Sequence, residues 1–277
     1  MSAVTPASGT AATTDRAVAP VVDESGRVVL AAVGKRYETR RGPVDAVADV
    51  DLEVAPGEFV AIVGASGCGK STLLRILAGF ERHTSGTVEV GGAPVRGPAP
   101  ERGVVFQDYG LFPWLTVAEN VRFGLRQQRV PRSRARRRAA EMIEVVGLSR
   151  FADRFPGELS GGMQQRVAIA RVLAGDPALL LMDEPFGALD ALTRTTMQHE
   201  LKRLRAESGA TVLFVTHSIE EAVYLSDRVV VMAGGASHGA PGHIAEIVPV
   251  GLGDVRDVNG PEFNDLERRI AALVHES

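Results

Sequence analysis

A glycine-rich stretch beginning at Gly64 has residue types and spacing suited to holding phosphate. It reads Gly64-Ala65-Ser66-Gly67-Cys68-Gly69-Lys70-Ser71-Thr72 and follows the apolar run 58–63. Glycines let backbone N–H groups wrap the β- and γ-phosphates, Lys70 offers a charge to the same oxygens, and the Ser71 hydroxyl suits Mg²⁺. With a strand expected before it and a helix after it, the stretch fits the P-loop pattern. A dinucleotide-binding loop is excluded, because the third glycine is missing at the required spacing.

Two adjacent carboxylates, Asp183 and Glu184, come directly after the apolar run 179–182. A run without alternation is typical of a strand buried on both faces of a parallel sheet, and ligands collect at the carboxyl ends of such strands. A solvated acidic turn is the weaker interpretation, because burying unpaired charge is costly. We expect Asp183 to face a hydrated Mg²⁺ and Glu184 to face an attacking water.

A second candidate phosphate site lies at Leu159–Arg166, which reads Leu-Ser-Gly-Gly-Met-Gln-Gln-Arg. The Ser/Gly-rich turn opens an expected helix, and a helix N-terminus attracts phosphate through its unpaired N–H groups and its dipole. One phosphate site is ordinary for a nucleotide-binding enzyme. A second one in the same chain requires an explanation.

Three single residues are weaker candidates. His217 follows the expected strand 211–216, and Gln107 follows the expected strand end at 106. A turn residue is an equally good interpretation for His217. A purely structural role is the better one for Gln107, and for Tyr37, whose ring could otherwise stack on a base.

These residues need a scaffold of alternating strands and helices. Expected strands are 28–33, 44–54, 58–63, 87–90, 103–106, 179–182, 211–216 and 229–232. Expected helices are 73–79, 117–125, 135–146, 167–174, 193–207 and an amphipathic 263–273, and Ser218 with Glu221 predicts a capping box. The alternation predicts an α/β domain, and about 108–158 is expected to be a helical insertion because no strand pattern occurs there.

Composition sets further limits. The chain has 277 residues, 45% of them apolar, and a net charge of −3, which gives no steering toward nucleic acid or anionic lipid. Its apolar runs are too short to span a bilayer. The single cysteine, Cys68, excludes an intrachain disulfide, suits a cytosolic protein and is interpreted as a small loop residue rather than a redox switch. Residues 1–26 lack signal-peptide features and are expected to be a disordered tail.

Two surface features have open interpretations. Five arginines between positions 132 and 138 could bind nucleic acid or lipid headgroups, but a solvated helix face is favoured. The apolar triplet Phe112-Pro113-Trp114 is either core or an exposed anchor for a partner.

The order and spacing of these motifs resemble an ABC transporter ATP-binding subunit. The match includes the P-loop, Gln107, the 159–166 signature, Leu179–Glu184, Gly187-Ala188-Leu189-Asp190 and His217. The resemblance implies a P-loop NTPase with a RecA-like core, an antiparallel β subdomain and the inserted helical subdomain. We therefore divide the chain into a tail (1–26), an ABC ATPase domain (27–245) and a C-terminal extension (246–277).

The resemblance also implies roles for the candidate residues, with ATP and Mg²⁺ as the ligands. Tyr37 would stack on adenine, and residues 64–72 would hold the phosphates. Ser71, Asp183 and Gln107 would face Mg²⁺, while Glu184, His217, Lys70 and Gln107 would serve catalysis. Such ATPases work as head-to-tail pairs, so Ser160, Gly161, Gly162 and Asp190 would face the nucleotide bound by the P-loop of a second copy.

Segments 106–114 and 183–194 are similar to importers of nitrate, sulfonate and taurine. The implied partners are permease subunits that dock on the helical subdomain near Phe112 and Trp114, and indirectly a solute-binding protein. The implied location is peripheral, on the cytoplasmic face of the plasma membrane, with no nucleic acid partner. Gly234–His243 is longer than the expected turn, and the short tail leaves no room for the regulatory domain of maltose-type ATPases.

Two alternatives belong to other classes. A soluble ABC ATPase acting on nucleic acid or ribosomes would be expected to carry a long coiled-coil insertion or a second cassette. A regulatory module that binds ATP without turnover is disfavoured by the presence of Glu184 and His217.

Overall fold

The computed structural model describes residues 24–40, 42–235, 239–253 and 255–276. Its strands are β1 Val28–Thr39, β2 Gly42–Val54, β3 Phe59–Gly64, β4 Ser85–Val90, β5 Ala93–Pro94, β6 Arg102–Val105, β7 Leu179–Asp183, β8 Thr211–Val215, β9 Arg228–Gly235 and β10 Ala240–Pro249. Its α-helices are α1 Lys70–Ala78, α2 Val117–Gln127, α3 Arg132–Val145, α4 Gly161–Ala174, α5 Ala191–Ser208, α6 Ile219–Leu225 and α7 Pro261–Glu276. Most of the expected tail and residues 236–238 of the Gly234–His243 segment lie outside the described residues.

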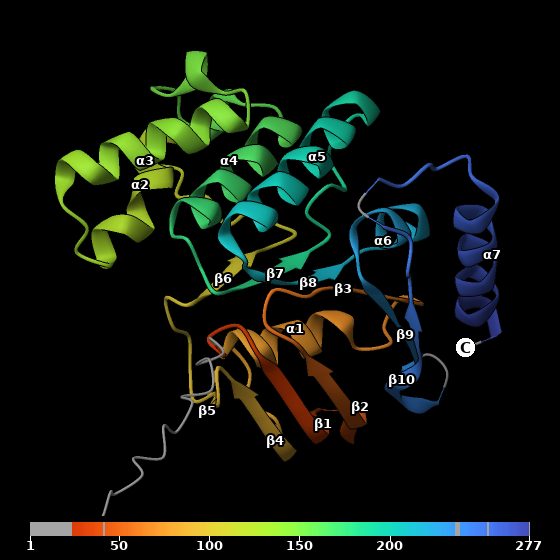
Figure 1. Ribbon diagram of the computed structural model, residues 1–277. Coiled ribbons are helices and arrows are strands. Elements are labelled where there is room, and N and C mark those ends of the chain that lie inside the picture. Colours follow the sequence, from red (N-terminus) through yellow and green to blue (C-terminus); the bar gives the residue numbers. More distant parts are fainter. Residues whose placement is uncertain (1–23, 41, 236–238, 254, 277) are drawn as a thin grey trace, which may run out of the picture.

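The described strands form one mixed sheet in the order β5-β4-β1-β2-β10-β9-β3-β8-β7-β6 (Figure 1). Strands β3, β6, β7 and β8 pair in parallel, and β9 joins them on the other side of β3. Strands β3, β7 and β8 are buried at every residue, as expected for parallel strands covered on both faces.

Helices α1 and α4 lie on opposite faces of this parallel part (Figure 1). Leu73 and Leu77 of α1 pack with Leu181 and other odd-numbered residues of β7. Val167 and Ile169 of α4 belong to the other cluster, which takes the even-numbered residues of β7. The period of two along each strand therefore divides the core into two layers.

The parallel strands end together at one edge of the sheet. Ile62 of β3 and Asp183 of β7 both pair with Val215 of β8, and Met182 pairs with Val105 of β6. The loops that follow these strands therefore meet at their carboxyl ends, where open α/β sheets bind ligands.

The antiparallel strands β1, β2, β4 and β5 form the other part of the sheet and border the P-loop. A Cβ added at Gly69 would lie 2.3 Å from Cγ1 of Val47 in β2. The φ of +98° at Gly69 also favours glycine, so a side chain is excluded at this contact for two reasons.

Residues 108–158 contain α2, α3 and two short 3-10 turns, and no strand. Thr116 and Glu119 form a reciprocal capping box that begins α2. Val121 of α2 and Ile143 of α3 are buried in the same cluster as the residues of α4. The predicted helical insertion thus packs on the α4 face of the sheet.

The C-terminal region differs from expectation in one element. The strand β10 was not predicted, and it runs across positions 245 and 246, where the extension was expected to begin. Its sequence includes Pro241, Gly242 and His243, which give little strand signal, but pairing with β9 supplies its hydrogen bonds. The predicted amphipathic helix is present as α7, with Phe263 and Ile270 buried against α6 and β9.

The predicted capping box at α6 is half correct. The Ser218 side chain accepts from the Glu221 N–H at 3.2 Å. The Glu221 carboxylate, however, does not return to Ser218 and instead accepts from the Thr216 hydroxyl at 2.7 Å. The Thr216 hydroxyl oxygen accepts a hydrogen bond from the Ser218 N–H at 3.0 Å, a bond that the capping box had assigned to the Glu221 carboxylate.

Within the described part of the chain, no helix has the length and apolar character needed to cross a membrane.

Candidate functional site

The P-loop turns from β3 into α1 with its lysine folded back on the loop. Lys70 is 6% exposed, and its Nζ donates to the backbone oxygens of Gly64 and Ala65 at 2.8 Å each. Helix α1 begins without a side-chain cap, so the first N–H groups of α1 have no side-chain acceptor. The uncapped N-terminus of α1 and one buried ammonium suit an anion at this turn.

Glycine is required where β3 ends and the P-loop begins, because the backbone of β9 lies close by. Gly64 has a φ of +150°, and a Cβ there would lie 2.2 Å from the backbone oxygen of Met232 in β9. Only glycine fits this position. The residues present therefore suit a nucleotide phosphate, for which Lys70 would exchange loop carbonyls for phosphate oxygens.

Ser71 and Asp183 meet across the gap between α1 and β7. The Ser71 hydroxyl donates to Oδ1 of Asp183 at 3.2 Å, and Asp183 is 7% exposed. Burial raises the pKa of the Asp183 carboxyl, and the Ser71 hydrogen bond opposes this effect. A hydroxyl and a buried carboxylate beside a phosphate site match the oxygen ligands that Mg²⁺ prefers.

Among the described residues, no three His, Cys, Asp or Glu side chains gather into a ready-made metal cluster. A cation between Ser71 and Asp183 would therefore take its remaining ligands from phosphate and water, which is the usual arrangement for Mg²⁺.

The carboxylate of Glu184 lies between two strand-end side chains. His217 Nε2 is 2.6 Å from its Oε1, and Gln107 Nε2 donates to its Oε2 at 3.2 Å. His217 follows β8 and Gln107 follows β6, the two strands that flank β7. The three side chains that were separate candidates in the sequence are thus one cluster.

The backbone at Glu184 is strained. Its φ is +49°, in the left-handed region that costs a non-glycine residue of the order of 1 kcal/mol or more. Its N–H donates to the backbone oxygen of Val215 at 2.9 Å, which ties the strained residue to β8. Strain of this kind persists where surrounding structure holds a side chain in a required direction.

The Ser160–Gly162 turn begins α4, on the opposite face of the sheet from α1. Ser160 is exposed and its side chain accepts from the Met163 N–H at 3.3 Å, as an N-cap does. Asp190 is likewise the exposed N-cap of α5, where the N–H of Thr193 lowers the pKa of its carboxyl. Within the part of the chain that the structure describes, these two side chains bond to their own helices and make no hydrogen bond to the P-loop.

Tyr37 lies near the end of β1, half-buried, with the Lys35 ammonium 4.6 Å from the centre of its ring. Its strand neighbours β2, whose Val47 touches the P-loop at Gly69. The Lys35 ammonium covers one face of the ring.

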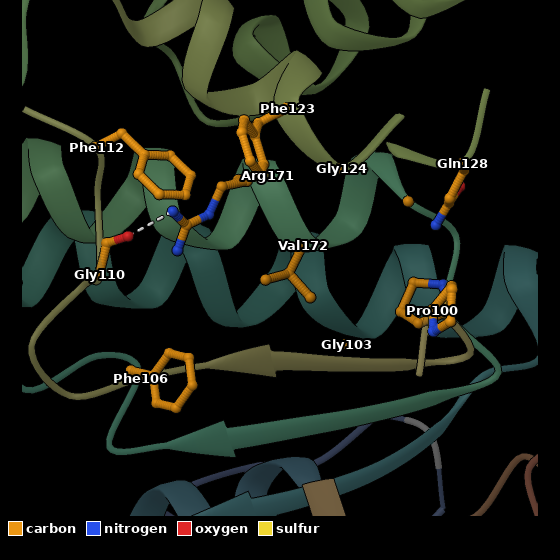
Figure 2. A pocket seen from close by; sticks show the side chains of 12 residues that line it. Pro100, Gly103, Phe106, Gly110, Phe112, Phe123, Gly124, Gln128, Arg171 and Val172 are labelled. Carbon is orange, nitrogen blue, oxygen red and sulfur yellow. Dashed lines mark hydrogen bonds between the residues drawn. The ribbon is translucent and has the colours of Figure 1, made fainter. Parts of the chain in front are cut away.

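A separate apolar hollow of about 350 Å³ opens between the helical insertion and the sheet (Figure 2). Phe106, Phe112 and Phe123 line it together with Arg171 of α4. The Arg171 guanidinium donates to the backbone oxygens of Gly110 at 2.6 Å and Tyr109 at 3.0 Å, so it fixes the loop that follows Gln107. Burial lowers the pKa of Arg171.

The triplet 112–114 was expected to be either core or an exposed anchor, and its two aromatic residues differ in this respect. Phe112 contacts Phe123 with ring centres 4.4 Å apart and lines the hollow, whereas Trp114 is 70% exposed. Buried Asn120 holds this loop. It accepts from the Phe112 N–H at 2.9 Å and donates to the backbone oxygens of Phe112, Leu115 and Thr116.

Two residues of this region were not predicted from the sequence, Asn120 and Gln165. Gln165 is 2% exposed and its amide bonds to the backbone at both Glu184 and Ala188. Asn120 shares the buried face of α2 with Val117 and Val121, where a polar side chain is a signal for a buried hydrogen-bonding role. Gln165 stands between Gln164 and Arg166 and carries no such signal.

Comparisons with known proteins agree with this geometry. Residues 47–187 match the family model described as ABC transporter. The chain is 49% identical over 240 residues to an uncharacterised ABC transporter ATP-binding protein of Methanocaldococcus jannaschii, covering 87% of this chain and 88% of that one. It is 53% identical over 197 residues to the taurine import ATP-binding protein TauB of Burkholderia pseudomallei, covering 71% of this chain and 76% of that protein.

A solved structure is similar as well. The dimeric ATP-binding cassette MJ0796, in a post-hydrolysis state with ADP and Pi, superposes with a TM-score of 0.73 at 34% identity, over 80% of this chain and 98% of that one. The predicted P-loop NTPase fold is thus confirmed. These relatives give no support to action on nucleic acid or ribosomes. The chain belongs to the ABC transporter family and is an ATPase subunit of the kind that serves importers.

Proposed function

We propose that this chain hydrolyses Mg-ATP as one half of a head-to-tail pair and thereby drives a membrane importer. The observation that carries the proposal is the Glu184 carboxylate, held between His217 and Gln107 at the sheet edge that also carries Lys70 and Asp183. An acceptor, a buried ammonium and a metal-ligand pair converge there on one phosphate site.

In this mechanism the side chains divide the work. Lys70 leaves the carbonyls of Gly64 and Ala65 and neutralises phosphate oxygens. Glu184 accepts a hydrogen bond from the attacking water and aims it, while His217 and Gln107 fix the carboxylate. Ser71 and Asp183 would hold Mg²⁺, which supplies charge neutralisation at the phosphates when bound. Tyr37 would stack on the base.

The signature turn serves the partner's nucleotide. Because α1 and α4 cover opposite faces of the sheet, Ser160, Gly161 and Gly162 are poorly placed for their own P-loop. A second copy related by a two-fold axis would present them to the P-loop of the first, and Asp190 would lie at the same interface. The dimeric solved cassette supports this arrangement.

The test is Glu184→Gln. This variant is expected to keep ATP binding and to lose about 100-fold or more in phosphate release, the usual cost of one charge-stabilising group. With saturating Mg-ATP it is expected to run as a dimer in size exclusion with light scattering. Phosphate release near the parent rate would contradict the role of Glu184, and a monomer with ATP bound would contradict the pair.

The hollow beside Phe112 is the proposed seat of a permease segment. Its aromatic lining is apolar, exposed Trp114 lies at its rim through contact with Phe112, and Arg171 connects it to the loop of Gln107. A partner seated there could therefore bias the Glu184 cluster through that loop. Peripheral attachment to the cytoplasmic face of the membrane follows from this docking.

For the solute we propose a small oxyanion or sulfonate such as nitrate or taurine. Support comes from segments 106–114 and 183–194 and from the TauB relative. Deleting the chain is expected to reduce uptake of labelled taurine, nitrate or an alkanesulfonate in the source cells, and restoring it should recover uptake. Unchanged uptake of all three would refute this solute class while leaving the ATPase proposal intact.

A further inference from the structure

Gln165 connects the signature helix to the turn that carries the catalytic carboxylate. It lies in the second turn of α4, and its Nε2 donates to the backbone oxygen of Glu184 at 3.2 Å. Its Oε1 accepts from the N–H of Ala188 at 3.1 Å. One buried amide thus holds both ends of the turn 184–188.

This turn needs such support. Glu184 has the strained φ of +49°, and its carbonyl also accepts from the Gly187 N–H at 3.2 Å. The direction of the Glu184 side chain depends on that backbone conformation, since φ and ψ set where Cβ points. Gln165 therefore acts on the carboxylate through the backbone, without touching the carboxylate.

The same helix carries the signature turn five residues earlier. Ser160 caps α4, and a Cβ added at Gly162 would lie 3.2 Å from the backbone oxygen of Ala188. The beginning of α4 thus abuts the turn at 184–188 by packing and is tied to it by Gln165. A helix moves as a rigid element, so a shift of the Ser160 end moves the Gln165 amide with it.

We propose that Gln165 is a positioning residue that couples the two nucleotide sites of the pair. Closure of the signature turn on the partner's nucleotide draws α4 into the position in which Gln165 holds Glu184 correctly over the chain's own nucleotide. This proposal rests on the head-to-tail pair proposed above. It assigns Gln165 to hydrolysis rather than to nucleotide binding.

The adjacent Gln164 provides a matched control. Its Nε2 donates to the backbone oxygens of Pro156 at 3.0 Å and Leu159 at 3.3 Å, so it holds the loop before the signature turn and not the turn after β7. Replacing either glutamine by methionine removes the hydrogen bonds and keeps a side chain of similar volume.

The experiment measures steady-state ATP hydrolysis by the full chain with Gln165→Met, Gln165→Ala or Gln164→Met. Both Gln165 variants are expected to lose about tenfold or more in kcat at saturating Mg-ATP, while the equilibrium Kd for ATP stays close to the parent value. Because the Ala188 N–H and the Glu184 carbonyl lose a buried partner, the thermal midpoint is expected to fall by a few degrees and to stay well above the assay temperature. The Hill coefficient for ATP is expected to exceed 1 in the parent and to fall to about 1 in Gln165→Met. Gln164→Met alters the loop before the signature turn, so its effect is expected in the KM for ATP and in ATP-dependent dimerisation, with the kcat at saturating Mg-ATP much less affected than in the Gln165 variants.

A double variant tests whether Gln165 acts through Glu184. Adding Gln165→Met to Glu184→Gln is expected to cause no further loss of rate, because both changes disable the same carboxylate. The double variant is still expected to dimerise with Mg-ATP.

The failures are distinguishable. If the parent does not hydrolyse ATP and the Glu184→Gln variant does not dimerise with Mg-ATP, the proposed function fails. If both of these tests succeed but Gln165→Met keeps the parent kcat, the positioning role fails. It also fails if the double variant is slower than Glu184→Gln alone. A parent Hill coefficient of 1 overturns the coupling of sites.

Discussion

At the scale of single residues, Glu221 shapes the turn that presents His217. Its carboxylate is 7% exposed, accepts from the Thr216 hydroxyl at 2.7 Å and lies 3.6 Å from Nε of Arg194 on α5. Burial raises its pKa, and the nearby charge of Glu220 acts in the same direction. The folded protein therefore holds the Glu221 proton to a higher pH than the unfolded chain does.

This shift predicts how stability changes with pH. As pH rises from the unfolded-state pKa of about 4.3 through the raised folded pKa, the unfolded chain binds fewer protons than the folded one, so the free energy of unfolding falls. Glu221→Gln removes this loss. We expect the stability of the variant relative to the parent to increase from pH 4.5 to pH 7 in urea unfolding.

The matched control is Glu38→Gln at an exposed position of β1, away from any helix terminus. Its stability difference from the parent is expected to change little over the same pH range. A Glu221→Gln difference that is flat with pH would contradict the buried-carboxylate argument.

Side chains proposed to act on ligands were easier to identify from the sequence than side chains that hold other residues in place. Lys70, Asp183, Glu184 and His217 follow expected strands, and parallel pairing brings those strand ends together. Gln165 stands in a helix between Gln164 and Arg166, and its partners are backbone atoms 19 and 23 positions away. No local pattern reports such a pairing.

At the scale of elements, the loop before α2 depends on Asn120. This side chain is fully buried and makes four hydrogen bonds to the backbone of 112–116. The loop places Phe112 in the hollow and Trp114 outside it. The positions of Phe112 and Trp114 on the helical insertion therefore depend on the Asn120 hydrogen bonds and not only on the conformational preference of the loop.

Asn120→Ala is expected to loosen this loop. It leaves the Phe112 N–H without its side-chain acceptor, which costs about 1–3 kcal/mol of unfolding free energy. Trp114 is the single tryptophan of the chain, so its fluorescence anisotropy reports on the loop, and it is expected to fall. Asn264→Ala in α7 makes the same chemical change elsewhere, and equal anisotropy in the two variants would count against the role given to Asn120.

Helices and strands were predictable where their burial leaves a regular apolar pattern in the sequence. The continuous apolar runs of β3, β7 and β8 were found, and so were α2 and α3. β10 was not, because Pro241 and Gly242 interrupt any alternation and its pairing partner β9 supplies what the local sequence does not. The missing half of the α6 capping box has a similar cause, since Thr216 competes for both groups.

At the scale of the whole molecule, the P-loop and the proposed signature turn lie on opposite faces of the sheet. The P-loop enters α1 on one face of the sheet, and the signature turn begins α4 on the other. Ser66 and Ser160, one in each motif, are both exposed. In the proposed two-fold pair, the signature turn of each copy would face the P-loop of the other, so an approach of one copy's Ser66 to the other's Ser160 would be repeated in reverse.

Cross-linking tests this arrangement with two chains that each carry one thiol. Ser66→Cys and Ser160→Cys are made separately in a Glu184→Gln background, with buried Cys68 replaced by serine so that only the new thiols react. Mixing the two chains with Mg-ATP and a mild oxidant is expected to give a covalent dimer, because a disulfide forms only when the two Cα atoms approach within about 7 Å. Either chain alone should give none, and neither should the mixture without ATP. A link between like chains, or one independent of ATP, would place the signature turn elsewhere.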